Sequence, residues 1–185
     1  ANQATVLDQV GKDCRPVLSL VDQVKPGDTS NVEGHAAACY WQMVYDEFYP
    51  QFMRDRNLAM VNPLLNYGYA LLRAAAARAV VGAGLLVSYG LFHKSKYNAY
   101  ALADDLMEPF RPYIDRGCYD MLLEFGPQGV NELSFIHKER LLKQLTQDVV
   151  MDKVTSPLQI ALQRSAVSLV HCLSGERRKL LLPSL

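Results

Sequence analysis

Three features that would each point to a particular class of protein are scarce or missing in this sequence. The longest apolar run, AVVGAGLLV at positions 79–87, is far shorter than a membrane span. The 19 basic and 19 acidic residues cancel, so no whole-protein field attracts nucleic acid. The cysteines form no CxxC or CxxH pair, which argues against structural zinc and a disulfide framework. We expect reduced, mostly buried thiols at Cys14, Cys39, Cys118 and Cys172.

The composition that remains is that of a folded domain. Half of the 185 residues are hydrophobic and 21% are charged, which is enough apolar material for a core. The chain opens ANQATVLDQV, without an initiator methionine or a secretory signal. We therefore expect a piece of a longer cytoplasmic protein with no membrane association.

Helical periodicity dominates the chain, and an alternating strand pattern of useful length is missing. Breaks near Gly11 and Pro16 separate one or two initial helices, and Pro50 marks the end of the next. Asn62 followed by Pro63 then predicts the start of a long, Ala-rich helix that is apolar on most sides. Further helices are expected from about residues 99, 113, 132 and 156. The fold class predicted is all-α, a multi-helix bundle around the central Ala-rich helix.

The segment HKSKYNAYALADDLMEPFRP, residues 93–112, concentrates acidic side chains on one predicted helix. Asp105 and Glu108 are three residues apart and share a helix face, where two carboxylates repel unless a cation lies between them. Pro109 has no N–H, so the helix must end or kink there. A metal or catalytic site is one interpretation. Neutralisation of the pair by Arg111 is the other, and the spacing alone does not decide between them.

Two further polar residues have ordinary structural explanations. Ser30 and Glu33 fit the S-x-x-E capping box, in which the glutamate bonds back to the backbone at the start of a helix. His93 follows an apolar turn, where a histidine is commonly a hydrogen-bonded core or surface residue. Asn98 is a candidate cap for the acidic helix. Spacing by itself favours an acidic face on a helical bundle.

Three blocks of the sequence resemble the CRISPR-associated integrase family that inserts new spacers into a CRISPR array. They are GDTSNVEGHAAACYW at 27–41, NPLLNYGYALLRAAAARAVVGAGL at 62–85 and HKSKYNAYALADDLMEPFRPYID at 93–115. Their order and spacing agree with the family over roughly half of the chain, and their residues are most similar to those of the type II branch. The pair LNYGYALL and DLMEPFRP is specific.

The resemblance implies an organisation and an activity. In that family a β-sandwich lobe precedes an all-helical catalytic lobe, and no strand-rich lobe is present here. Residues 1–26 would be the inter-lobe connecting helices and residues 27–185 the helical catalytic lobe, one domain overall. The activity implied is metal-dependent transesterification, which joins the 3′-OH of captured DNA to a CRISPR repeat, with DNA cleavage as a related reaction.

The family's catalytic residues can be carried onto matching positions. Its metal ligands correspond to Glu33, His93 and Glu108, and Asp105 matches a second acidic position that supports or shares the site. Asp104 has no counterpart, and we expect it to be outer-shell or solvent-facing. Two carboxylates and an imidazole with open positions suit Mg²⁺ or Mn²⁺, which keep water ligands and bind phosphate oxygens.

Binding partners follow from the same resemblance. DNA, as a prespacer duplex and a CRISPR repeat, needs local cations, and the candidates are Arg54, Arg56, Lys94, Lys96 and Arg111. Core packing is expected for most of a set of tyrosines that could instead stack on a base: Tyr67, Tyr69, Tyr97 and Tyr100. The family works with a small second subunit and dimerises largely through the lobe that is missing here, which puts a homodimer in doubt.

Two other function classes stay open on the sequence alone. The fragment could be a module that binds DNA but is inactive without the β lobe, or a helical interaction domain whose acidic residues are only surface. A di-iron carboxylate bundle ranks last, because no E-x-x-H pair occurs.

Overall fold

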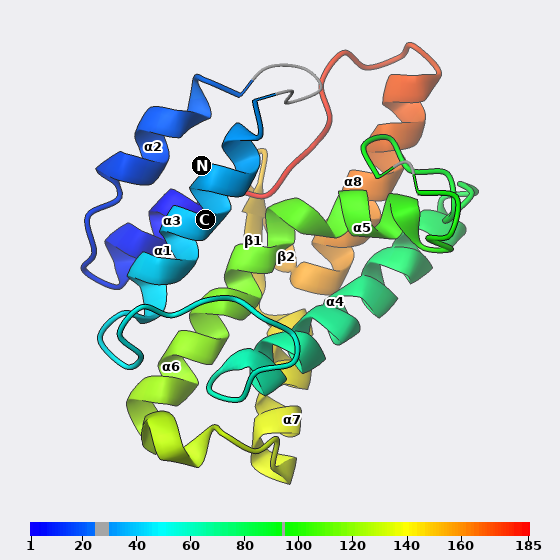
Figure 1. Ribbon diagram of the computed structural model, residues 1–185. Helices are drawn as coiled ribbons and strands as arrows, with labels where there is room; N and C mark the ends of the chain where they lie inside the picture. Colours follow the sequence, from blue (N-terminus) through cyan, green and yellow to red (C-terminus); the bar gives the residue numbers. More distant parts are fainter. Residues whose placement is uncertain (25–29, 94) are drawn as a thin grey trace. The chain divides into compact units, whose positions relative to one another are not determined.

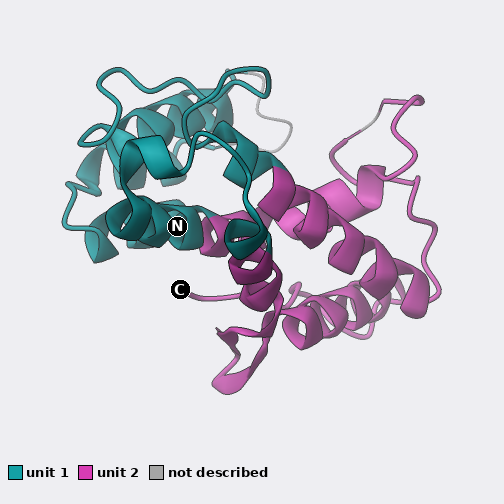
Figure 2. Ribbon diagram, turned by 90° about the horizontal axis from the view of Figure 1, so that it is seen from below, with its two compact units in different colours: residues 1–66, 115–138 teal, residues 67–114, 139–185 magenta. Residues whose placement is uncertain are grey.

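The computed structural model describes residues 1–24, 30–93 and 95–185 (Figure 1). The chain divides into two compact units, each assembled from two stretches of sequence (Figure 2). Unit 1 comprises residues 1–66 and 115–138, and unit 2 comprises residues 67–114 and 139–185. The predicted boundary between residues 26 and 27 lies outside the described residues and stays a prediction.

Unit 1 begins with three helices that contact one another: α1 (Asn2–Gln9), α2 (Arg15–Val21) and α3 (Val32–Tyr45). Gly11 has a positive φ of 73° between α1 and α2, and Pro16 occupies the first turn of α2, so the predicted break is confirmed. The α3 helix ends at Tyr45, five residues before the end that Pro50 predicts. The chain then turns through residues 46–51 without a helix.

Aromatic rings form the core of unit 1. Trp41 and Tyr45 stack with ring centroids 6.0 Å apart, and Phe52 meets Tyr45 edge-on at 5.1 Å. The carboxylate of Asp115, only 1% exposed, accepts the Tyr40 hydroxyl at 2.9 Å. The Tyr45 hydroxyl donates to the Asp115 carbonyl at 3.0 Å. A buried charge is tolerated here because hydrogen bonds replace water.

Three helices contribute residues to both units, because the unit boundaries fall within them. They are α4 (Asn62–Gly82), α6 (Arg111–Gly129) and α7 (Phe135–Lys143). The α4 helix is the long Ala-rich helix that the sequence predicts, and it starts at the predicted Asn62. It is buried on one side and not all round, since Ala70, Ala74, Arg78 and Val81 form an exposed row at helical spacing.

Unit 2 adds α5 (Ala101–Met107), the 3₁₀ turns η1 (Glu108–Phe110) and η2 (Gln144–Thr146), and α8 (Leu158–Leu173). The end of α5 before Pro109 confirms the predicted helix break. Gly175, with φ of 80°, follows α8 as predicted, and its N–H bonds to the carbonyl of Cys172. The predominance of helix confirms the all-α class.

A short β-hairpin in unit 2 adds two strands that the sequence pattern did not reveal. Strands β1 (Asp148–Met151) and β2 (Val154–Pro157) pair antiparallel and pack on α8. The turn between them uses Asp152 and Lys153, both with positive φ, which matches a type I′ hairpin turn. Because Asp-Lys is not one of the usual Asn-Gly or Asp-Gly pairs and each strand has four residues, the sequence signal was too weak to find.

Two further expectations from the sequence concern membrane-spanning helices and the burial of the cysteines. None of the helices in the described part of the chain has the length and apolar character needed to cross a bilayer. All four cysteines are free thiols, but only Cys118 is buried, so the expectation of mostly buried cysteines is wrong for the other three.

A pair of glycines on α4 tests the packing of unit 2. A Cβ on Gly68 would lie 2.5 Å from Ile114 Cγ2 and 3.2 Å from Leu141 Cδ2, whereas a Cβ on Gly82 meets nothing within 4 Å. We expect Gly68→Ala to destabilise the protein by about 1–3 kcal/mol, the usual cost of overpacking. Gly82→Ala should be neutral or stabilising by up to about 1 kcal/mol. Urea unfolding measures both, and equal stabilities of the two variants would contradict the close packing at Gly68.

Candidate functional site

The polar centre of unit 2 is the carboxylate of Asp105, which holds the segment that carries His93. Asp105 Oδ2 accepts the backbone N–H groups of Leu91 at 2.5 Å and Phe92 at 2.9 Å. Asp105 Oδ1 accepts the backbone N–H of His93 at 3.1 Å and lies 2.6 Å from the ring nitrogen Nδ1. The predicted pair of Asp105 and His93 is therefore brought together, by bonds to main chain as well as to the ring.

Gly90 allows this close approach. A Cβ at position 90 would lie 2.3 Å from the carbonyl oxygen of His93, 2.8 Å from Ala101 Cβ and 3.1 Å from Asp105 Oδ2. The first of these contacts is with backbone, which cannot move aside as a flexible side chain can. A side chain at position 90 would therefore push the His93 segment away from Asp105.

The surroundings of Asp105 change its acidity. Burial, which leaves 9% of the side chain exposed, acts to raise the pKa of the carboxyl. The hydrogen bonds from the Phe92 N–H, the His93 ring, and the N–H groups of His93 and Leu91 oppose burial, and the net result is a lowered pKa for Asp105. The group is therefore an acceptor-only carboxylate at neutral pH. When the imidazole of His93 is neutral, the Asp105 carboxylate fixes the ring hydrogen on Nδ1 and leaves the lone pair on Nε2.

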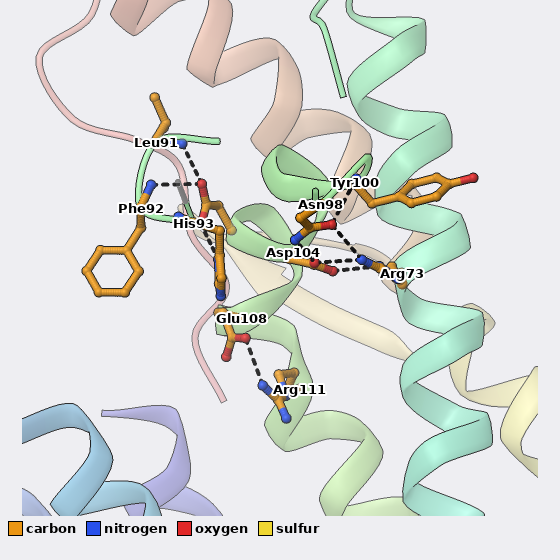
Figure 3. Close-up of polar contacts among 10 residues, drawn as sticks. Arg73, Leu91, Phe92, His93, Asn98, Tyr100, Asp104, Glu108 and Arg111 are labelled. Carbon is orange, nitrogen blue, oxygen red and sulfur yellow. Dashed lines mark hydrogen bonds and ion pairs between the residues drawn. The ribbon is translucent and has the colours of Figure 1, made fainter. Parts of the chain in front are cut away.

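Glu108 follows one turn after Asp105, at the first position of η1. Its carboxylate is 46% exposed and accepts a hydrogen bond from Arg111 Nη1 at 2.7 Å. The Arg111 guanidinium also lies over the Tyr69 ring at 4.3 Å from the ring centre. Arg111 thus neutralises Glu108, as the simpler interpretation expected, whereas Asp105 is satisfied by the His93 segment. In Figure 3 the His93 ring and Glu108 lie on the same side of α5.

Asp104 is not solvent-facing, because only 19% of its side chain is exposed, whereas the alternative expectation of an outer-shell place stays a prediction. Both of its oxygens contact Arg73 of α4, with Nη2 donating to Oδ2 at 2.7 Å and Nε at an ion-pair distance of 2.7 Å from Oδ1. The Asn98 side-chain amide also donates to Asp104 Oδ2, at 2.7 Å. Sequence reasoning missed Arg73. The one available signal was an isolated charge in the apolar stretch LLRAAAA.

The capping predictions for Glu33 and Asn98 are wrong in detail. The N-cap of α3 is Asn31 and not Ser30, so Glu33 is the second helical residue, one position too early for a capping box. The N-cap of α5 is Tyr100. Asn98 supports that start from outside the helix, by accepting the Tyr100 backbone N–H at 3.0 Å.

Glu33 belongs to unit 1, whereas His93, Asp105 and Glu108 belong to unit 2. The geometry of each unit by itself does not test whether Glu33 reaches the other three, and their convergence stays a prediction. Within the described ranges, histidine, cysteine and acidic side chains form no group of three or more arranged to hold a metal ion.

The predicted DNA-binding cations have different surroundings. Arg54 is partly buried, donates to Asn62 and Asn66 at 2.8 Å each and lies over Trp41, so it supports the start of α4. Arg56 and Lys96 are exposed. Arg111 pairs with Glu108 as described above, and Lys94 lies outside the described residues. The structure thus presents Arg56 and Lys96 to solvent, and DNA binding by all five stays a prediction.

The tyrosines near the site are less buried than expected. Tyr69 is 8% exposed and packs in the core, whereas Tyr97 and Tyr100 are 85% and 46% exposed. Core packing is therefore the wrong expectation for these two. Tyr100 lies beneath the Arg73 guanidinium, 4.9 Å from the ring centre, and Tyr97 lies beside the Lys96 ammonium.

The lowered pKa of Asp105 predicts an acid-dependent loss of stability. Because the folded pKa lies below the unfolded value of about 3.9, the stabilisation is complete above that pH and is lost as the pH falls through the folded pKa. Asp105→Asn should be less stable than the native protein at pH 7, and the difference should shrink below about pH 4. Urea unfolding across pH 3–7 measures it, with the exposed Asp22→Asn as control. A difference that does not vary with pH would show that the carboxylate charge is not what holds the segment.

Comparisons with known proteins find relatives in sequence and in fold. Residues 7–126 match the family model described as CRISPR associated protein Cas1. Over 116 residues the chain is 47% identical to the CRISPR-associated endonuclease Cas1 of Neisseria meningitidis serogroup C (strain 8013), covering 62% of this chain and 37% of that protein. The CRISPR-associated endonuclease Cas1 2 of Pyrobaculum aerophilum is 29% identical over 160 residues, which is 86% of this chain and 53% of the relative.

A solved structure shares the fold. The chain resembles one described as a casposase bound to integration product, with a TM-score of 0.76 and 23% identity. The similarity covers 97% of this chain and 62% of the casposase chain. In each of these comparisons the present chain matches about a third to three fifths of the other protein.

Proposed function

Since the chain belongs to the Cas1 family of CRISPR-associated proteins, we propose that it is the helical part of a metal-dependent DNA integrase and endonuclease of CRISPR adaptation. Its substrates would be a captured DNA duplex with 3′-OH ends and a CRISPR repeat. Its partner would be the small second subunit of the adaptation complex, and the family's homodimer is not part of the proposal because the dimerising lobe lies outside this chain. The relatives' name of endonuclease and the casposase's integration product support this choice of reaction.

One observation carries the proposal. The part-buried carboxylate of Asp105 holds the imidazole of His93, and the exposed carboxylate of Glu108 lies on the same side of α5, one turn later in the chain. Histidines that bind metals commonly direct their other ring nitrogen to a carboxylate, which fixes the tautomer and the ring orientation. His93 and Asp105 have this relation at 2.6 Å. Glu108 supplies the exposed carboxylate at 46% exposure.

These donors fit a hard divalent cation. Glu33, His93 and Glu108 would hold Mg²⁺ or Mn²⁺, with Asp105 orienting His93 from behind. The bound ion supplies charge neutralisation at the nonbridging phosphate oxygens and lowers the pKa of an attacking hydroxyl. Arg111 lies beside Glu108 at 2.7 Å, and from there its guanidinium would contact a phosphate oxygen of DNA bound at the site.

The reaction exchanges one phosphodiester bond for another. The 3′ oxygen of the captured DNA forms a bond to phosphorus in the repeat, and the bond from that phosphorus to the 3′ oxygen of the repeat strand breaks. The attacking hydroxyl loses its proton, and the leaving oxygen gains one, so charge is conserved. With water as the nucleophile the same bond breaks by hydrolysis. The exposed Lys96 and Arg56 would contact the DNA backbone.

Glu108→Gln tests this function against a matched control. Glu139 is 47% exposed and pairs with Lys143 at 2.7 Å, so Glu139→Gln removes an equally exposed, equally paired carboxylate from the same unit. Strand transfer of a 3′-OH duplex into a repeat-bearing plasmid, with Mg²⁺, Mn²⁺ or EDTA, is the readout. Glu108→Gln should lower the rate by at least about 100-fold, because metal stabilisation of the transition state is worth several kcal/mol. Glu139→Gln should leave it unchanged, and both variants should retain duplex binding.

Two results would contradict the proposal. Native strand transfer by Glu108→Gln would remove the metal site from the mechanism. DNA binding by the native protein without strand transfer or cleavage in any metal, with and without the small second subunit, would show a binding module and not an enzyme.

A further inference from the structure

The segment that carries His93 is anchored at both ends by adjacent carboxylates of α5. We call residues 90–93 and 95–100 the histidine segment. Asp105 holds its first part through the backbone of residues 91–93, as described above. Asp104, the preceding residue, holds its last part through Asn98 and through Arg73 of α4. Figure 3 shows the two sets of contacts on either side of α5.

The second anchor is a closed set of polar contacts. Arg73 Nη2 donates both to Asp104 Oδ2 at 2.7 Å and to Asn98 Oδ1 at 3.0 Å. The Asn98 amide donates to Asp104 Oδ2 at 2.7 Å, which completes a triangle of three side chains. Asn98 Oδ1 also accepts the Tyr100 N–H, and the Tyr100 ring lies against the Arg73 guanidinium. The guanidinium therefore fixes the segment to α4 through charge, hydrogen bonding and a ring face.

Apolar packing does little to hold the histidine segment. Its large apolar side chains are exposed, with Leu91 at 49%, Phe92 at 56% and Tyr97 at 85%. Internal bonds, such as the Asn98 N–H to the Ser95 carbonyl at 3.0 Å, shape the turn but do not attach it to a helix. The position of the segment therefore depends on its polar anchors, and both ends must be fixed to limit its conformational freedom.

We propose that Arg73, Asn98 and Asp104 are positioning residues for His93, acting through the segment and not by contact with metal or DNA. The expected effect of these residues on activity rests on the proposed function. With the second anchor removed, residues 95–100 separate from α4 and the opening spreads to the backbone bonds of residues 91–93. His93 then occupies its metal-binding position for a smaller fraction of the time.

Amide hydrogen exchange in the metal-free protein tests the positioning itself. Asp104→Asn should raise exchange at Leu91, Phe92 and His93 by about tenfold, because a closed segment with two anchors becomes one with a single anchor. Arg73→Lys, which keeps the charge but loses the planar fork, should restore part of the protection when compared with Arg73→Gln.

The matched control is Asp13→Asn. Arg15 donates to both oxygens of Asp13 at 2.8 Å, so this change removes an ion pair of similar geometry from unit 1. It should leave exchange at residues 91–93 unchanged. Unchanged exchange at these amides in Asp104→Asn would overturn the proposal, and so would an increase equal to that of amides throughout unit 2, which would indicate general destabilisation.

A Mn²⁺ titration of strand transfer links the anchor to the reaction. Asp104→Asn should require about tenfold more Mn²⁺ for half-maximal rate, the lower end of the effect of residues that orient a metal ligand, and saturating Mn²⁺ should recover most of the native rate. An unchanged Mn²⁺ requirement together with raised exchange would overturn the coupling to His93. Absence of strand transfer in the native protein would instead refute the proposed function, while the exchange result would still decide the positioning.

Discussion

The site depends on one part-buried carboxylate, that of Asp105, whose hydrogen bonds to water are replaced by hydrogen bonds from the main chain. Asp105 accepts three consecutive backbone N–H groups and contacts the His93 ring, all from a segment with little apolar burial of its own. A carboxylate with 9% of its side chain exposed is costly unless its oxygens are satisfied, and here each oxygen has two partners. The same hydrogen bonds therefore both stabilise the Asp105 charge and position His93. Gly90 is needed because any larger residue would occupy the space that these bonds use.

The adjacent aspartates show how two carboxylates in sequence perform different tasks. Successive helix positions point about 100° apart, so Asp104 faces Arg73 on α4 while Asp105 faces the turn that carries His93. Glu108, one turn later, keeps an exposed carboxylate with a single arginine beside it. Three carboxylates within five residues are thus separated into an anchor, an orienting group and a candidate ligand. This separation relieves the like-charge repulsion that the sequence alone suggests.

The sequence predicts those parts of this arrangement in which the interacting residues are close together along the chain. The break at Pro109 and the start of α4 at Asn62 follow from rules that act within a few residues, and the structure confirms them. The role of Asp104 could not be predicted, because Arg73 is 31 residues away and no spacing rule connects them. The hairpin was missed because β1 and β2 have four residues each and an Asp-Lys turn. The capping box was predicted wrongly because the N-cap is Asn31, which makes Glu33 the second helical residue and not the third.

The central claim is that Glu33 of unit 1 and His93 and Glu108 of unit 2 share one divalent ion. Isothermal titration of the metal-free protein with Mn²⁺ tests it most directly, with Glu33→Gln, His93→Ala and Glu108→Gln measured alongside. The account predicts one stoichiometric site in the native protein and a large loss of affinity in each of the three variants. Native Mn²⁺ affinity in Glu33→Gln would contradict the account, because a ligand that can be removed without effect does not share the ion.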